Sequence, residues 1–172
     1  FTMQTMALRM RRKGIQVFII APLKGHEFYR AARNVGGEFI QISPASKNCI
    51  NIMEIRKVDN SVNELLDGPT LDASALAGKI QRLHIFFSLL IPDMSHEEKQ
   101  LLDEALIKTY ARKGITHKNE SLTDPQHPEQ YKKMPILEDV YNVLLESEDT
   151  KRLAHILNRL VHGSASSFNQ QT

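Results

Sequence analysis

Three side chains of different chemistry lie close together in one short segment: Lys24, His26 and Glu27. They follow Val17–Ile20, a continuous apolar run rich in β-forming residues that Pro22 ends abruptly. Ligands of α/β folds bind at the carboxyl ends of parallel strands, so we place the candidate site in this turn. An ordinary polar loop explains the same residues, because Glu27 would stand in the first turn of a helix, where negative charge is favourable.

The elements around this turn form a strand, helix, strand pattern. A helix is predicted from about His26 until Gly36 and Gly37 stop it, and Glu38–Ile42 is predicted to be a second short strand. Short connections on both sides are typical of adjacent parallel strands joined by a right-handed crossover. The first part of the chain is therefore predicted to be α/β.

The later part of the chain has helical patterns. An apolar stripe over Leu76–Leu90 predicts one helix, and Ser95 with Glu98 forms a capping box that opens the next, giving a helical hairpin. Pro135 is expected at the first position of a third helix, and a fourth ends at Gly163. These four helices predict a small, mainly α-helical subdomain.

The organisation predicted from these patterns has four parts. Residues 1–58 form a partial α/β core, and residues 59–71 are a linker by composition. Residues 72–163 form the helical subdomain, and residues 164–172 return toward the α/β core.

A basic cluster ends the first predicted helix, Phe1–Lys13: Arg9, Arg11, Arg12 and Lys13, followed by Gly14. Cations in a last turn complement the helix dipole, and this capping role is favoured. The alternative, a DNA-binding patch, rests on this cluster alone.

Composition narrows the function classes. The 22 Lys and Arg nearly balance the 20 Asp and Glu, so the net charge of +2 gives no global argument for nucleic acid or membrane binding. A single cysteine, Cys49, and the lack of an apolar run of about 18 residues predict a soluble, intracellular chain. No G-x-x-x-x-G-K-[ST] phosphate loop occurs, and no His or Cys spacing predicts a metal site.

Several motifs together resemble the conjugative-transfer ATPases of type IV secretion, most of all those encoded by integrative and conjugative elements of Gram-positive bacteria. The motifs of the first part are Pro22, Gly25-His26-Glu27-Phe28, Gly36-Gly37-Glu38, Ile42-Ser43-Pro44 and Ile50-Asn51-Ile52-Met53. Those of the helical part are Phe86-Phe87, Ser95, Tyr110–Gly114, Pro135–Asp139, Gly163-Ser164, Phe168-Asn169 and Thr172. The resemblance covers essentially the whole chain.

This resemblance implies a RecA-like core with an all-helical insertion, in a parent protein that uses ATP and Mg²⁺. The chain would lie between the Walker A and Walker B motifs, with Phe1 and Thr2 directly after the phosphate loop. Lys24 and His26, with Phe1 and Thr2, would face the nucleotide, and Glu27 would be the catalytic carboxylate. The family commonly has Asp where this chain has Ala21.

The family also implies a role and partners. The parent would energise pilus or channel assembly and DNA or protein export as a homo-oligomer. It would lie in the cytoplasm at the inner face of the membrane, with secretion-channel and coupling proteins as partners. The isolated segment, which lacks both nucleotide motifs, is expected to be inactive. The alternative is a non-catalytic helical module that docks channel components.

Overall fold

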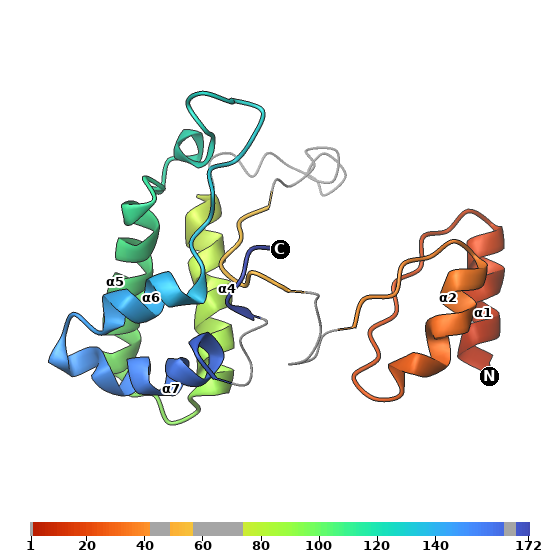
Figure 1. Ribbon diagram of the computed structural model, residues 1–172, viewed down its shortest axis with the longest axis horizontal. Helices are drawn as coiled ribbons and strands as arrows, with labels where there is room; N and C mark the ends of the chain where they lie inside the picture. Colours follow the sequence, from red (N-terminus) through yellow and green to blue (C-terminus); the bar gives the residue numbers. More distant parts are fainter. Residues whose placement is uncertain (1, 42–48, 57–73, 164–167) are drawn as a thin grey trace. The chain divides into compact units, whose positions relative to one another are not determined.

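The computed structural model describes residues 2–41, 49–56, 74–163 and 168–172. The chain divides into two compact units, Phe1–Gln41 and Ile42–Thr172 (Figure 1). Because the placement of one unit relative to the other is not determined, each is described by itself. Within the described ranges, no helix has both the length and the apolar character needed to cross a bilayer.

The first unit contains three short helices. They are α1 (Thr2–Arg12), the 3-10 helix η1 (Gly25–Phe28) and α2 (Tyr29–Asn34). The sequence predicts a helix from about His26 to Gly36, and η1 followed by α2 confirms it. Gly36 adopts a left-handed φ of 68°, as expected of a glycine that ends a helix.

The sheet predicted for this unit is not shown. The described residues contain no strand over Val17–Ile20 or from Glu38 to Gln41, and Ile42 lies outside them. Across all described residues, the recorded β-type pairing is an isolated antiparallel bridge between Thr123 and Tyr131. An inner parallel strand needs hydrogen-bonded neighbours and cover on both faces. Here the side chains of Phe18, Ile19 and Ile20 are exposed instead.

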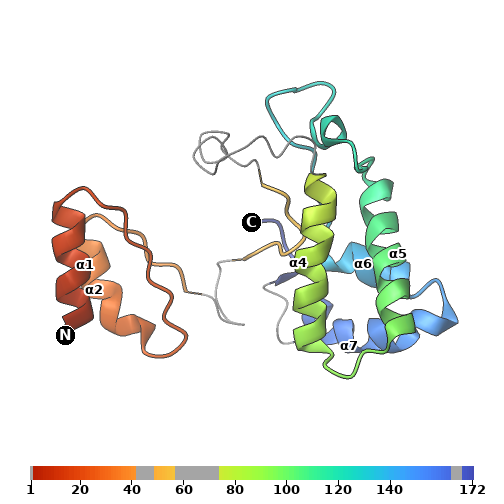
Figure 2. The same cartoon turned by 180° about the vertical axis from the view of Figure 1, so that it is seen from behind.

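The second unit is a helical bundle, as the sequence predicts. Its long helices are α4 (Ala75–Leu90) and α5 (His96–Arg112), which form the expected hairpin, with α6 (Leu137–Leu144) and α7 (Lys151–Val161) lying across them (Figures 1 and 2). Two 3-10 helices, η2 (Asn119–Leu122) and η3 (Glu148–Thr150), lie in the connections.

The core of the second unit draws apolar side chains from all four helices. Fully or almost fully buried members include Leu83, Phe87, Leu102, Leu106, Leu137, Leu144, Leu153 and Leu157. Met53 and Ile55, from the non-helical residues 49–56, are buried in the same core. The predicted boundaries put these two residues in the α/β part, whereas they are buried in the core of the helical unit. Most of the predicted linker, residues 59–71, lies outside the described residues.

Two helix starts compare directly with their predictions. The capping box is confirmed: the Ser95 hydroxyl accepts from the Glu98 amide at 3.1 Å, and the Ser95 amide donates to the Glu98 carboxylate at 2.9 Å. Pro135 is not the first helical residue, because α6 begins at Leu137. The Asp139 carboxylate accepts from the Ile136 amide at 2.9 Å and so fixes the helix start two residues later.

Candidate functional site

The predicted site residues of the first unit lie on one tight turn. Lys24 has φ 57° and ψ 25°, the left-handed region, and immediately precedes η1, which carries His26 and Glu27. It is the one non-glycine residue with positive φ among the described residues. This conformation costs a non-glycine residue about 1 kcal/mol, and such strain concentrates at functional sites.

The turn is fixed to α1 by a hydrogen bond. The Gln4 side chain donates to the Glu27 carbonyl oxygen at 2.8 Å, and the Glu27 amide donates to the Lys24 carbonyl at 3.1 Å. Thr2, the first residue of α1, is therefore only two positions from a residue that contacts the turn. Phe1 lies outside the described residues. The structure thus connects the start of α1 with the turn, as a shared site would require.

The functional groups of the turn are accessible. The side chains of Lys24, His26 and Glu27 are all exposed, so a ligand can reach an ammonium, an imidazole and a carboxylate within four residues. A cation and an imidazole suit phosphate oxygens, and a carboxylate suits a water molecule or a metal-bound group. Ala21 is half-buried and supplies no ligand atom. Within the described ranges, no three His, Cys, Asp or Glu residues gather closely enough to hold a metal ion.

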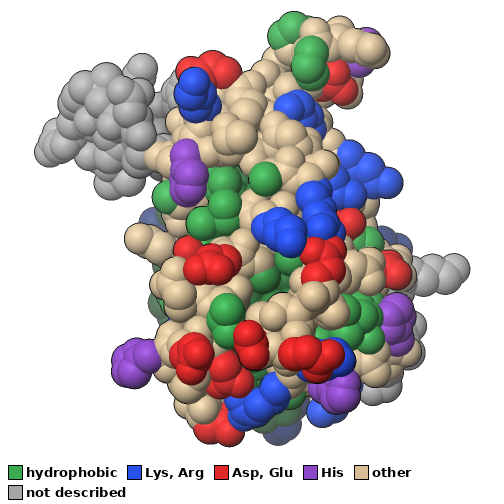
Figure 3. All heavy atoms as spheres, turned by 90° about the vertical axis from the view of Figure 1, so that its left-hand side faces the viewer, with side chains coloured by type: hydrophobic (Ala, Val, Ile, Leu, Met, Phe, Trp, Pro, Cys, Tyr) green, Lys and Arg blue, Asp and Glu red, His purple; other side chains and the backbone are tan. Residues whose placement is uncertain are grey.

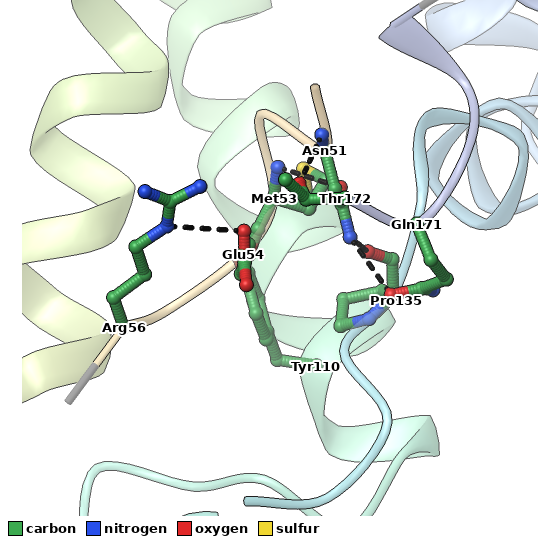
Figure 4. A network of polar contacts seen from close by, with 8 residues as sticks. All are labelled: Asn51, Met53, Glu54, Arg56, Tyr110, Pro135, Gln171 and Thr172. Atoms are coloured by element: carbon green, nitrogen blue, oxygen red, sulfur yellow. Dashed lines mark hydrogen bonds and ion pairs between the residues drawn. The ribbon is translucent and has the colours of Figure 1, made fainter. Parts of the chain in front are cut away.

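A second polar centre, which the sequence analysis missed, joins distant parts of the helical unit. Asn51 is 3% exposed, and its side-chain amide donates to the Pro135 carbonyl at 2.9 Å (Figure 4). Its side-chain oxygen accepts from the Met53 amide at 2.9 Å, and its own amide donates to the Thr172 hydroxyl at 2.9 Å. One buried asparagine therefore joins residues 49–56, the start of α6 and the last residue of the chain.

The last residues reinforce this junction, which we call the Asn51 hub. The Gln171 side chain donates to the Met134 carbonyl at 2.9 Å, and its oxygen accepts from the Asn51 amide group at 3.3 Å. Asn169 accepts from the Glu138 amide at 2.7 Å. Residues 49–56 and 168–172 thus lie side by side against α6. A weak sign of this hub is visible in the sequence, where a polar residue stands between two isoleucines, Ile50-Asn51-Ile52.

Tyr110 completes the hub from α5. Its hydroxyl donates to the Met53 carbonyl at 2.5 Å, and the side chain is fully buried (Figure 4). Burial raises the pKa of the Tyr110 phenol. In the sequence, Tyr110 stands out only as the first residue of the family motif Tyr110–Gly114, and no local pattern shows its partner 57 residues away.

A solved structure has the same overall fold. The chain matches the structure of VirB4 of Thermoanaerobacter pseudethanolicus with a TM-score of 0.73 and 27% sequence identity, over 97% of this chain. This likeness supports a relationship to the type IV secretion ATPases. The chain corresponds to 57% of the length of the VirB4 structure. No family model matches the sequence, and no curated protein matches it either.

The likeness to VirB4 agrees with the family suggested by the sequence motifs. It covers nearly the whole chain, so it includes both the Lys24–Glu27 turn and the helical unit.

Proposed function

We propose that this chain is the central part of a type IV secretion ATPase, lying between its Walker A and Walker B motifs within a RecA-like core. The observation that carries the proposal is the likeness to VirB4 over 97% of the chain. The family motifs of the sequence support it independently, because they occur in both units.

In this proposal the Lys24–Glu27 turn faces the nucleotide. Lys24 and His26, together with Phe1 and with Thr2, the first residue of α1, hold the phosphate groups of ATP. Glu27 orients or deprotonates the attacking water, and ATP with Mg²⁺ supplies the phosphoryl group and its charge neutralisation. The left-handed Lys24 and the hydrogen bond from Gln4 to Glu27 support a turn built for positioning.

The isolated 172-residue chain is proposed to be inactive. Phosphoryl transfer needs a phosphate loop and an acidic residue that organises Mg²⁺, and the sequence contains no phosphate-loop motif. A coupled assay of phosphate release is expected to give no turnover with Mg-ATP. Steady hydrolysis that follows the chain through purification would overturn this claim.

The catalytic assignment is tested in a longer protein that contains the phosphate loop. Glu27→Gln is expected to lower kcat about a hundredfold, because it removes a carboxylate that acts in the transition state. Glu38→Gln is the matched control, since Glu38 is also exposed and lies in the same unit. Equal kcat values for the two variants would remove Glu27 from the mechanism.

The proposed role is to energise pilus or channel assembly and the export of DNA or protein. The parent would act as a homo-oligomer at the inner face of the membrane, with channel and coupling proteins as partners. This role follows from the family relationship and is tested by loss of transfer in cells that carry the Glu27→Gln protein.

The alternative is a helical docking module without catalysis. It is favoured by one observation: all of the described buried core residues belong to the second unit, which therefore has a core of its own. A capture experiment for it should use residues 49–172, because Met53, Ile55 and residues 168–172 belong to the helical unit. Capture of a channel component by this segment, with no effect of Glu27→Gln on transfer, would favour the module.

A further inference from the structure

A hollow on the helical unit has a mixed lining of cationic, apolar and polar side chains. It has a volume of about 330 Å³ and lies between residues 54–56 and residues 131–134, with Gln171 at its edge. Among the described residues, its charged lining residues are Glu54, Arg56, Lys132 and Lys133, which carry three positive charges and one negative charge. None of these residues was singled out by the sequence analysis.

Within the described ranges, the positive charge of the hollow is only partly compensated. Arg56 pairs with Glu54 through Nε at 3.2 Å (Figure 4). Lys132 donates to the Gly114 carbonyl at 2.8 Å, a neutral acceptor that leaves its charge in place. Lys133 is exposed, and no side chain among the described residues pairs with it.

The positive field extends to the adjacent helix α4. Burial and then the charge of Arg82 lower the pKa of the half-buried Lys79, while Glu54 raises it and Arg56 lowers it again. Lys79 thus lies within electrostatic reach of Glu54 and Arg56, and Glu54 is the one acid among the described lining residues.

The floor of the hollow is apolar, and hydrogen bonds hold the segments that form it. Ile55 and Met134 are 6% and 5% exposed, and Tyr131 is half-buried beside them. The Asn51 hub holds both sides, because Gln171 donates to the Met134 carbonyl and Tyr110 donates to the Met53 carbonyl. Such a floor can accept an aliphatic side chain without rearrangement, while the cations at the rim accept carboxylates.

We propose that this hollow binds an acidic peptide segment of a partner protein, with carboxylates on Arg56, Lys132 and Lys133 and an aliphatic side chain over Ile55 and Met134. The mixed lining favours a peptide over a nucleic acid, because Glu54 would lie against phosphates and the apolar floor would be left without a partner. A strand of nucleic acid also needs a basic track beyond one hollow.

The neighbouring surface supports the choice of a peptide. Figure 3 shows acidic and basic side chains interspersed over the face that carries α5. Arg152 on this unit is already paired with Asp93 and Glu98, each at 2.6 Å, and Glu146 is paired with Lys108 and Arg112. Arg152, Lys108 and Arg112 thus have acidic partners within the unit.

The test is direct binding by the 172-residue chain, and it needs no nucleotide, so its outcome is independent of the proposed ATPase. The probe is a short fluorescein-labelled peptide of alternating Glu and Val, followed by fluorescence anisotropy. Lys133→Glu is expected to weaken binding about tenfold, since it exchanges an attraction for a repulsion. Lys99→Glu, the same charge change at an exposed position of α5, is expected to change affinity less than about twofold.

Three results would overturn the proposal. They are no saturable binding of the Glu-Val peptide, an equal loss of affinity in both variants, and tighter binding of single-stranded oligothymidine that Lys133→Glu abolishes. Far-UV circular dichroism spectra that match the unsubstituted chain would show that the variants are folded. A labelled Lys-Val peptide should not bind, and its binding would also contradict the proposal.

Discussion

The two units use similar apolar residues in opposite ways. In the first unit, Phe18, Ile20 and Leu23 are 82%, 92% and 84% exposed. In the second, Leu102 and Leu106 are fully buried. The described residues of the first unit include none that is buried. Burial, and not apolar composition, therefore distinguishes the two units.

The difference follows from whether apolar faces find partners. The stripes of α4, α5, α6 and α7 face one another, so each helix covers its neighbours. The first unit has three short helices and the non-helical segment Val17–Ile20, and these leave most apolar side chains in contact with solvent. Burial of a leucine side chain is worth about 2 kcal/mol, so stability should reside in the second unit.

A matched pair of leucines tests this contrast most strongly. Leu106→Ala should lower the free energy of unfolding by about 3 kcal/mol, because it leaves a cavity in the core. Leu23→Ala in the first unit should change it by less than about 0.5 kcal/mol. Guanidinium denaturation followed by circular dichroism measures both. Similar losses would show that the first unit has a core of its own.

The Asn51 hub is the next most sensitive feature. Asn51→Ala should cost about 2 kcal/mol, because the Met53 amide and the Pro135 carbonyl lose their partners inside the protein. Asn158→Ala, an exposed position of α7, is the control and should cost little. If both variants unfold at the same denaturant concentration, the hub does not hold the unit together.

The capping box should contribute about 1 kcal/mol. Ser95→Ala removes the hydroxyl that accepts from the Glu98 amide at the start of α5. Ser88→Ala, at an exposed position of α4, removes a hydroxyl without a capping role. If Ser95→Ala lowers the melting temperature less than Ser88→Ala does, the assigned cap is contradicted.

Tyr110 predicts a loss of stability in alkali. Its pKa is raised in the folded state, so above about pH 10 the unfolded phenol ionises while the folded one stays protonated. The stabilisation that this phenol contributes is complete below that pH. Above it, the free energy of unfolding falls by up to about 1.4 kcal/mol per pH unit. In Tyr110→Phe this loss is absent, so the stability difference between the two proteins should shrink as pH rises. A difference that stays constant between neutral and alkaline pH would be inconsistent with the buried phenol.

Local signals were sufficient to predict the helical unit. The stripe over Leu76–Leu90 and the pair Ser95 and Glu98 determine structure through neighbours three or four residues apart, so the sequence displays them. Pro135 was predicted to be the first residue of its helix, and this was wrong. The hydrogen bond that the Asp139 carboxylate accepts from the Ile136 amide decides where the helix begins, and it outweighs the preference of proline for a first helical position.

The features that the sequence could not predict depend on distant partners. The run Val17–Ile20 has the composition of a strand, but a strand exists only through its neighbours, and the described residues supply none. Asn51 and Thr172 are 121 residues apart, so no local pattern reveals their contact. For the candidate site, sequence adjacency guarantees that Lys24, His26 and Glu27 share a turn. Whether that turn faces a nucleotide is a property of the longer protein and stays a prediction.

The most direct test of the proposed function is a structure of the longer protein that contains the phosphate loop, determined with a bound non-hydrolysable ATP analogue and Mg²⁺. The proposal predicts that Lys24 and His26 lie against the phosphate oxygens and that the Glu27 carboxylate faces the position of the attacking water. A nucleotide bound at a site remote from the Lys24–Glu27 turn would contradict it.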